Sequence, residues 1–197
     1  MRVVGIDLAG NPNRDTGIAV LSRRSFRTAT LHEDEEIIEL CSEEDPSIVA
    51  IDAPLTMPSS GNLRRADVEL IKMGFRVFPP TFGGMLSLTN RGIQLSNLLR
   101  LRKIKIIEIH PRTSGLILFG TNRREAWLRE LRRMGFRFGD MKSRHEVDAC
   151  MAALTGWLHL RGFSETVGDP REGEIVIPLP PTSWKRYSSR SLKRPRP

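Results

Sequence analysis

The sequence predicts an α/β fold in which a mixed five-stranded sheet carries helices on both faces. Three observations support this prediction. Three β-rich segments near the N-terminus are joined by short turns, which is typical of an antiparallel meander. Two later apolar segments are each reached through helical sequence, which indicates parallel crossovers. The remaining segments, up to about residue 178, show helical spacing of apolar residues, which places helices against the sheet.

The meander is predicted at residues 2–8, 16–22 and 26–32. The first segment is rich in β-branched residues, which suit a strand in the middle of a sheet. The links "GNPNRD" and "RRS" are short and rich in turn-forming or polar residues. We therefore expect three consecutive antiparallel strands, the first of which ends on Asp7.

A helix and a fourth strand are predicted next. The segment "EDEEIIELCSEED" places its acids early, as the first turn of a helix prefers. The segment "SIVAID" is almost continuously apolar, which suits a strand covered on both faces, and it ends on Asp52. Residues 62–103 then read as two helices separated by "FRVFPPTFGG", whose prolines and glycines exclude regular structure. This stretch is expected to be a loop or lid between the two helices.

The last third of the domain begins with a fifth strand, "IKIIEIHP", which Pro111 stops. Two short helices are expected between residues 113 and 135. A longer helix is predicted to open at Ser143, because "SRHE" fits a capping box closed by Glu146. The segment "EGEIVIP" is a candidate edge strand. The domain is thus predicted to span residues 1–178, followed by a basic tail at 179–197 whose composition indicates disorder.

Charge indicates a polyanionic partner. The net charge is +8 and the basic residues are clustered, which favours DNA or RNA over a membrane surface. Arg64 and Asp67 lie one helical turn apart, which is also the spacing of a simple ion pair. The basic clusters are Arg64 and Arg65, Arg100 to Lys105, Arg123 to Arg137, and the tail.

The remaining composition points to a protein of the cytoplasm. Cys41 and Cys150 lie far apart without metal-ligand spacing, so neither a disulfide framework nor a zinc site is expected. The chain has no apolar run of the roughly 18–20 residues that a membrane span needs. It also lacks the apolar stretch of a signal peptide.

Four acids are candidates for a common site. Asp7, Asp52 and Glu108 lie at or near the ends of predicted strands, and Asp148 lies in the second turn of the long helix. Parallel strands bring their carboxyl ends to one edge of a sheet, where ligands bind in open α/β folds. Carboxylates that meet there require a cation, and oxygen ligands suit Mg²⁺ or Mn²⁺. Paired ions of this kind drive displacement at phosphorus.

Each candidate also has a purely structural interpretation. Asp7 and Asp52 precede turns and are able to bond the backbone there. Glu108 is close in sequence to arginines with which it can pair, and Asp148 can face solvent on its helix. His145 shares a helix face with Asp148 and is able to touch a scissile phosphate, but a histidine exposed on a surface is equally consistent.

The combined motifs carry a resemblance. "GIDLAG…TGIAV", "AIDAPL", "EIHP" and "HEVDACMAALTGWL" resemble an uncharacterised family of predicted nucleases with a ribonuclease H-like fold, from about Met1 to Pro178. The His145-x-x-Asp148 pattern is similar to the end of the active site in Holliday-junction resolvases of that superfamily. The resemblance implies that Asp7, Asp52 and Asp148 are metal ligands. It extends less firmly to Glu108, because the fourth acid varies in position among these enzymes. The resemblance also implies that residues 62–103 are a helical insertion, because they are longer than the minimal fold requires.

The functional hypothesis is a Mg²⁺- or Mn²⁺-dependent nuclease that acts on DNA or RNA by a two-metal mechanism. Asp7 and Asp52 are expected to hold one ion, and Asp7 and Asp148 the other. Glu108 would orient a water or a ligand, and His145 would assist. The alternative is a nucleic-acid-binding protein that keeps this fold without catalysis. Phosphoryl transfer from a nucleotide is disfavoured, since the sequence has no GxxxxGK[ST] loop.

Overall fold

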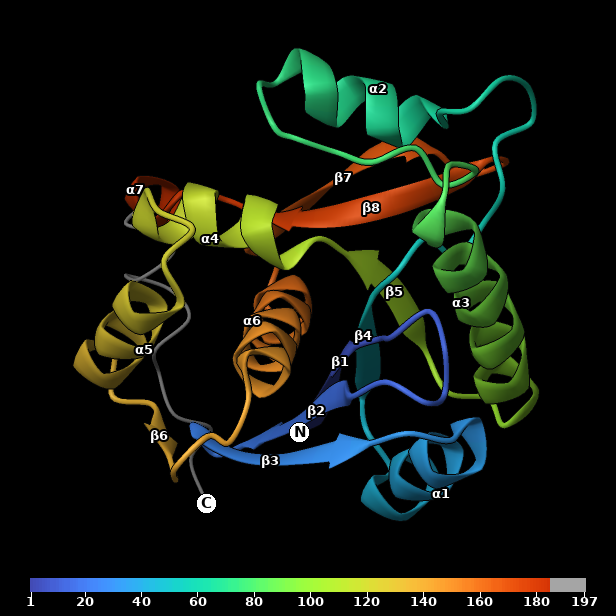
Figure 1. The fold of residues 1–197 in the computed structure, drawn as a ribbon. Helices are drawn as coiled ribbons and strands as arrows, with labels where there is room; N and C mark the ends of the chain where they lie inside the picture. The colour runs from blue at the N-terminus through green and yellow to red at the C-terminus, as the bar shows by residue number, and fades with distance from the viewer. Residues whose placement is uncertain (185–197) are drawn as a thin grey trace.

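The computed structural model describes residues 1–184, which form a mixed eight-stranded sheet in the order β6-β3-β2-β1-β4-β5-β8-β7 (Figure 1). The tail predicted to be disordered falls outside the described residues from position 185 onward. The strands are β1 Arg2–Asp7, β2 Thr16–Ser22, β3 Ser25–Leu31, β4 Ile48–Asp52, β5 Ile106–Ile109, β6 Arg137–Phe138, β7 Ser164–Asp169 and β8 Gly173–Pro178. The helices are α1 Asp34–Glu44, α2 Arg65–Lys72, α3 Gly84–Leu101, α4 Pro111–Phe119, α5 Arg124–Arg133, α6 Arg144–His159 and α7 Pro181–Trp184.

The five predicted strands are present and run in the predicted directions. β1 lies between β2, to which it is antiparallel, and β4, to which it is parallel. β3 continues the meander, and β5 pairs parallel to β4. The carboxyl ends of β1, β4 and β5 therefore share one edge of the sheet, which is the arrangement that the sequence predicts.

Three further strands widen the sheet beyond the predicted five. β6 adds two residues beside β3, and β7 and β8 form an antiparallel hairpin beyond β5. The segment "EGEIVIP" was expected at an edge, but its strand β8 lies inside the sheet, parallel to β5 on one side and antiparallel to β7 on the other. Its successive buried residues Ile175, Val176 and Ile177 explain this place, because an inner strand is covered on both faces. The sequence of β7, SETVGD, is mostly polar and does not predict a strand.

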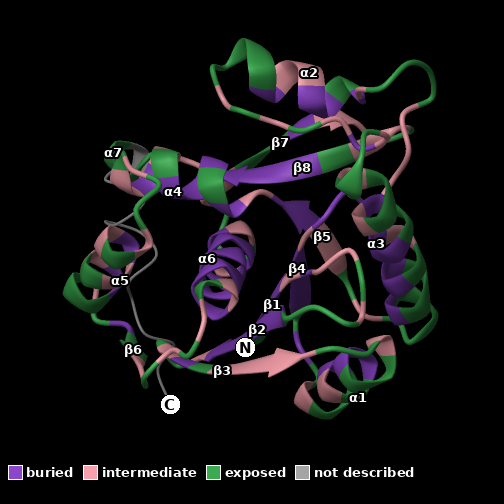
Figure 2. Cartoon of the chain, in the orientation of Figure 1, coloured by how far each residue is buried: buried purple, intermediate pink, exposed green. Residues whose placement is uncertain are grey.

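Helices cover both faces of the sheet, as Figures 1 and 2 show. On one face α6 packs with α4 and α5, and Figure 2 shows it buried along most of its length. On the other face α1 and α3 pack against β1, β2 and β4. Successive side chains of β1 point to opposite faces of the sheet. Val3 therefore packs on the face covered by α6, and Val4 and Ile6 pack on the face covered by α1 and α3.

Two glycines allow α6 to lie directly on the central strands. A Cβ atom at Gly5 would lie 2.1 Å from the carbonyl oxygen of Ala149, and one at Gly17 would lie 2.1 Å from that of His145. Any side chain at these positions would push the helix away from β1 and β2. The first turns of α6 are thereby held over the ends of the strands.

Residues 62–103 contain the two expected helices, α2 and α3, which are separated by an irregular stretch at residues 73–83. Helix α2 packs on the β7–β8 hairpin through Ala66 and Leu70, which contact Val167 and Ile175. Among residues 1–184, no helix combines the length and apolar character that crossing a bilayer requires.

Candidate active site

A cleft of about 680 Å³ opens at the carboxyl ends of β1, β4 and β5. Its walls come from the strand ends, the first turns of α6, the loop after α2 and the start of α4. The structure brings all five predicted site residues to this one cleft: Asp7, Asp52, Glu108, His145 and Asp148.

Asp7 and Asp52 are the innermost pair. They are register partners in the parallel β1–β4 ladder, so their side chains leave the sheet on the same face, close enough for the charge of Asp7 to act on Asp52. Asp52 keeps part of its surface open to the cleft, but protein surrounds its carboxylate closely. This desolvation, followed by the charges of Asp7 and Asp148, raises the pKa of Asp52 well above its usual range. The pair thus carries a repulsion that a bound cation would relieve.

Helix α6 adds His145 and Asp148 from its first two turns. The hydroxyl of Ser143 caps the helix by accepting the backbone N–H of Glu146 at 3.2 Å. The capping box is only half formed, because the Glu146 carboxylate turns away from Ser143. It accepts instead from the hydroxyls of Thr28 and Thr30 on β3 and from the backbone N–H of Lys142. These bonds tie the start of the helix to the sheet.

Asp7 and Asp148 each have a cationic or protonatable partner. His145 Nδ1 lies 2.7 Å from Oδ2 of Asp7, and this hydrogen bond raises the pKa of His145. Asp148 accepts both arms of Arg124, with 2.7 Å between Arg124 Nε and Asp148 Oδ1. Burial raises the pKa of Asp148 even though Arg124 opposes the shift. His145 therefore lies beside the acids, and the acid that it contacts is Asp7.

Glu108 occupies a different position from the aspartates. It is the register partner of Ile51, one residue before Asp52, so its side chain leaves the sheet on the opposite face. There Arg64 donates to both of its oxygens, at 2.7 and 2.6 Å, and the backbone N–H of Leu55 donates at 2.8 Å. Both carboxylate oxygens are thus occupied by protein donors, which leaves Glu108 poorly placed as a metal ligand.

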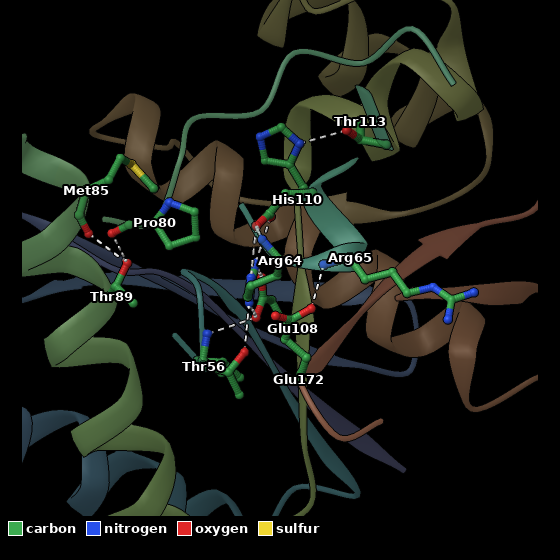
Figure 3. Close-up of polar contacts among 12 residues, drawn as sticks. Thr56, Arg64, Arg65, Pro80, Met85, Thr89, Glu108, His110, Thr113 and Glu172 are labelled. Atoms are coloured by element: carbon green, nitrogen blue, oxygen red, sulfur yellow. Dashed lines mark hydrogen bonds and ion pairs between the residues drawn. The ribbon is translucent and has the colours of Figure 1, made fainter. Parts of the chain in front are cut away.

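Arg64 is the centre of this buried network (Figure 3). It also bonds Asp67, at 2.9 and 3.1 Å, which confirms the ion pair that the spacing predicts. Burial alone would lower the pKa of Arg64, but the bonds to Glu108 and Asp67 outweigh it and raise that pKa. Arg64 belongs to one of the basic clusters from which the sequence predicts a polyanionic partner. Its side chain is only 1% exposed, so it is not available to a phosphate.

Four other arginines line the cleft, and sequence reasoning did not single them out. Arg124 comes from the predicted cluster at 123–137, and within residues 1–184 the other arginines of that cluster do not line the cleft. The only sequence signal for Arg124 was its place at the start of a helix, where a cation is unfavourable without an acidic partner. The four arginines are Arg76, Arg112, Arg124 and Arg144.

The donor chemistry of the site fits a divalent cation. Asp7 and Asp52 offer adjacent carboxylates, and Asp148 faces the same cleft. In the described part of the chain, no three acidic, histidine or cysteine side chains are gathered closely enough to hold a metal as they stand. The pairing of Asp148 with Arg124 is consistent with that finding, because it turns the third carboxylate toward a guanidinium.

Comparison with solved structures identifies the fold. The structure of RuvC from T. thermophilus in complex with a Holliday junction substrate matches with a TM-score of 0.56 and 14% identity, over 82% of this chain and 96% of that chain. A second Thermus thermophilus RuvC structure matches with a TM-score of 0.49 and 14% identity, over 82% and 97% of the two chains. The first likeness shows the fold, which is ribonuclease H-like, as the sequence resemblance implies.

Sequence comparison places the chain in a family. No curated protein gives a significant match. The family model described as "Protein of unknown function (DUF429)" matches residues 5–173, which is most of the chain. The protein therefore belongs to the DUF429 family and has a ribonuclease H-like fold.

Proposed function

We propose that this protein is a divalent-metal-dependent nuclease that hydrolyses phosphodiester bonds of DNA or RNA. The observation that carries the proposal is the meeting of Asp7, Asp52 and Asp148 in one cleft walled by arginines. An acidic centre can bind metal, and the basic walls can bind a phosphate backbone. The use of the same fold by a RuvC protein bound to a Holliday junction supports a nucleic-acid substrate.

The roles follow from the positions of the side chains. Asp7 and Asp52 would hold one Mg²⁺ or Mn²⁺ ion, and Asp7 and Asp148 a second. Metal ions at such carboxylates activate water and stabilise the leaving oxygen of an in-line displacement. His145 positions the Asp7 carboxylate through its hydrogen bond. Arg144, which lines the cleft beside His145, would hold a phosphate of the substrate.

Glu108 is assigned a positioning role in this proposal. Its bond to the backbone N–H of Leu55 fixes the turn that follows Asp52, and Arg64 compensates its charge. This replaces the expectation that Glu108 orients a water or a ligand, because both of its oxygens already accept protein donors.

The test is a cleavage assay with labelled DNA and RNA, single-stranded, double-stranded and branched, in Mn²⁺ or Mg²⁺. Asp7→Asn is compared with Asp15→Asn, whose side chain is 54% exposed and pairs with His32 outside the cleft. We expect the wild type and Asp15→Asn to cleave at similar rates and Asp7→Asn to lose at least about a hundredfold. Equal cleavage by highly purified wild type and Asp7→Asn would refute the assignment.

The second candidate is a nucleic-acid-binding protein without catalysis. The contact between Arg124 and Asp148 favours it, because that pair neutralises a carboxylate that catalysis requires. A binder should keep or gain affinity when Asp7 is changed to asparagine, since a negative charge leaves the cleft. Binding that is retained by both proteins, with no cleavage by the wild type, would support this candidate.

A further inference from the structure

Arg124 is the first residue of α5, and its guanidinium lies against Asp148 of α6. Nε donates to one carboxylate oxygen and Nη2 to the other, so both oxygens are occupied. The Arg124 side chain is 27% exposed, whereas that of Asp148 is 10% exposed. The pair thus joins a largely buried carboxylate to a guanidinium that is partly exposed in the cleft.

We propose that Arg124 is an exchangeable partner of Asp148: it holds this carboxylate in the empty cleft and transfers to a substrate phosphate when metal and nucleic acid bind. This inference rests on the proposed function, because it assigns Asp148 to metal binding. Its consequence is that metal and nucleic acid bind cooperatively. Each of them takes one member of the same ion pair.

The chemistry of the guanidinium permits this exchange. The planar guanidinium forms two parallel N–H···O hydrogen bonds with a carboxylate or with a phosphate, so either anion can be its partner. A metal ion at Asp148 would compete with the Nε and Nη2 groups of Arg124 for the same carboxylate oxygens. The N-terminal end of α5 also disfavours a cation, so an anionic partner stabilises Arg124 in either state.

Arg64 provides a comparison, because it is an arginine of the same molecule whose ion pairs are fully buried. Its side chain is 1% exposed and bonds two carboxylates and a hydroxyl. Moving it would strand two buried charges. Among the hydrogen bonds of the described residues, the Arg124 side chain bonds Asp148 alone and lines the cleft, so its release leaves one carboxylate without a partner, and a metal ion at Asp148 would compensate that charge.

A purely structural role for Arg124 makes the opposite prediction about metal binding. If Arg124 merely orients Asp148 as a ligand, its removal disorders the carboxylate and weakens metal binding. If Arg124 competes with the metal, its removal frees the carboxylate and strengthens metal binding. The sign of the change in Mn²⁺ affinity therefore separates the two.

The experiment is a calorimetric titration of the full chain with Mn²⁺, in the absence and presence of a 20-nucleotide single-stranded DNA or RNA. The proteins are the wild type, Arg124→Gln, Arg124→Lys and Arg112→Gln. Arg112 lines the same cleft without an ion pair to Asp148, so its change controls for the loss of one positive charge. Thermal unfolding followed by circular dichroism checks that each variant is folded.

We expect Arg124→Gln to bind Mn²⁺ about tenfold more tightly than the wild type without nucleic acid, and Arg112→Gln to change less than about threefold. Arg124→Lys, which keeps the charge but not the fork, should fall between the wild type and Arg124→Gln. Nucleic acid should tighten Mn²⁺ binding to the wild type and leave that of Arg124→Gln nearly unchanged.

Unchanged or weaker Mn²⁺ binding by Arg124→Gln and Arg124→Lys would overturn the inference. If the wild type cleaves nucleic acid but these variants bind Mn²⁺ no more tightly, the nuclease proposal survives and the exchange does not. If Arg124→Gln binds Mn²⁺ more tightly and no protein cleaves, the exchange survives and the nuclease proposal does not. Absence of Mn²⁺ binding by the wild type would overturn the inference.

Discussion

Replacing Arg64 by methionine would leave the carboxylates of Glu108 and Asp67 in the interior without the guanidinium that joins them. Five side-chain hydrogen bonds of 2.6 to 3.2 Å would be lost, from Arg64 to Glu108, Asp67 and Thr56. Breaking a buried pair by removing one partner costs about 3–5 kcal/mol, because the remaining charge is uncompensated. Against a total stability of about 5–15 kcal/mol, this is a large fraction.

Urea unfolding of the full chain, followed by circular dichroism, measures the loss. The matched control is Arg65→Ala, whose side chain is 62% exposed and pairs with Glu69, so its cost should stay below about 1 kcal/mol. The double variant Arg64→Met/Glu108→Gln should be more stable than Arg64→Met alone, because it removes one of the stranded charges. A loss below about 1 kcal/mol for Arg64→Met would refute the view that this buried network stabilises the folded chain.

Three other consequences can be measured on single variants. Asp52→Asn should raise the midpoint of thermal unfolding in EDTA by a few degrees, because it relieves repulsion with Asp7; a lower midpoint would contradict this. Gly17→Ala should cost about 1–3 kcal/mol in urea unfolding and slow cleavage at least tenfold, since its Cβ would meet the His145 carbonyl; wild-type values for both would argue against the close approach. Burial lowers the pKa of His110 to about 4, so the unfolded chain binds a proton first as pH falls below about 6.5. Stability should then drop by up to about 1.4 kcal/mol per pH unit between pH 6 and pH 4, and His110→Gln should lack this component when the two unfolding curves are subtracted.

Local signals in the sequence account for the centre of the fold. β-branched and continuously apolar segments specify the five central strands, and the spacing of apolar residues specifies the helices between them. Asp7 and Asp52 could be placed together because each ends a strand of a parallel pair, and parallel strands share a direction. The edge strands were harder to predict, since β7 is polar and β6 is only two residues long and pairs with distant β3.

The place of Glu108 depended on register, which the sequence does not specify for parallel strands. A shift of one residue moves a side chain to the other face of a sheet. Glu108 pairs with Ile51 instead of continuing the row of Asp7 and Asp52, so it faces Arg64 on the far side. Strand ends in sequence thus predict that acids are near one another, but not which face they share.

The sequence by itself determined the fold class, the aspartates at the strand ends and the helix that carries His145 and Asp148. These features depend on the order of residues within single elements. Only the tertiary structure decided the partner of each charge: Arg64 for Glu108, Arg124 for Asp148 and His145 for Asp7. Such partners lie up to 138 positions apart along the chain. Strand register determines which face Glu108 shares with Arg64, and the close approach of α6 to Gly5 and Gly17 brings His145 and Asp148 to the strand ends. Both are properties of the packed molecule.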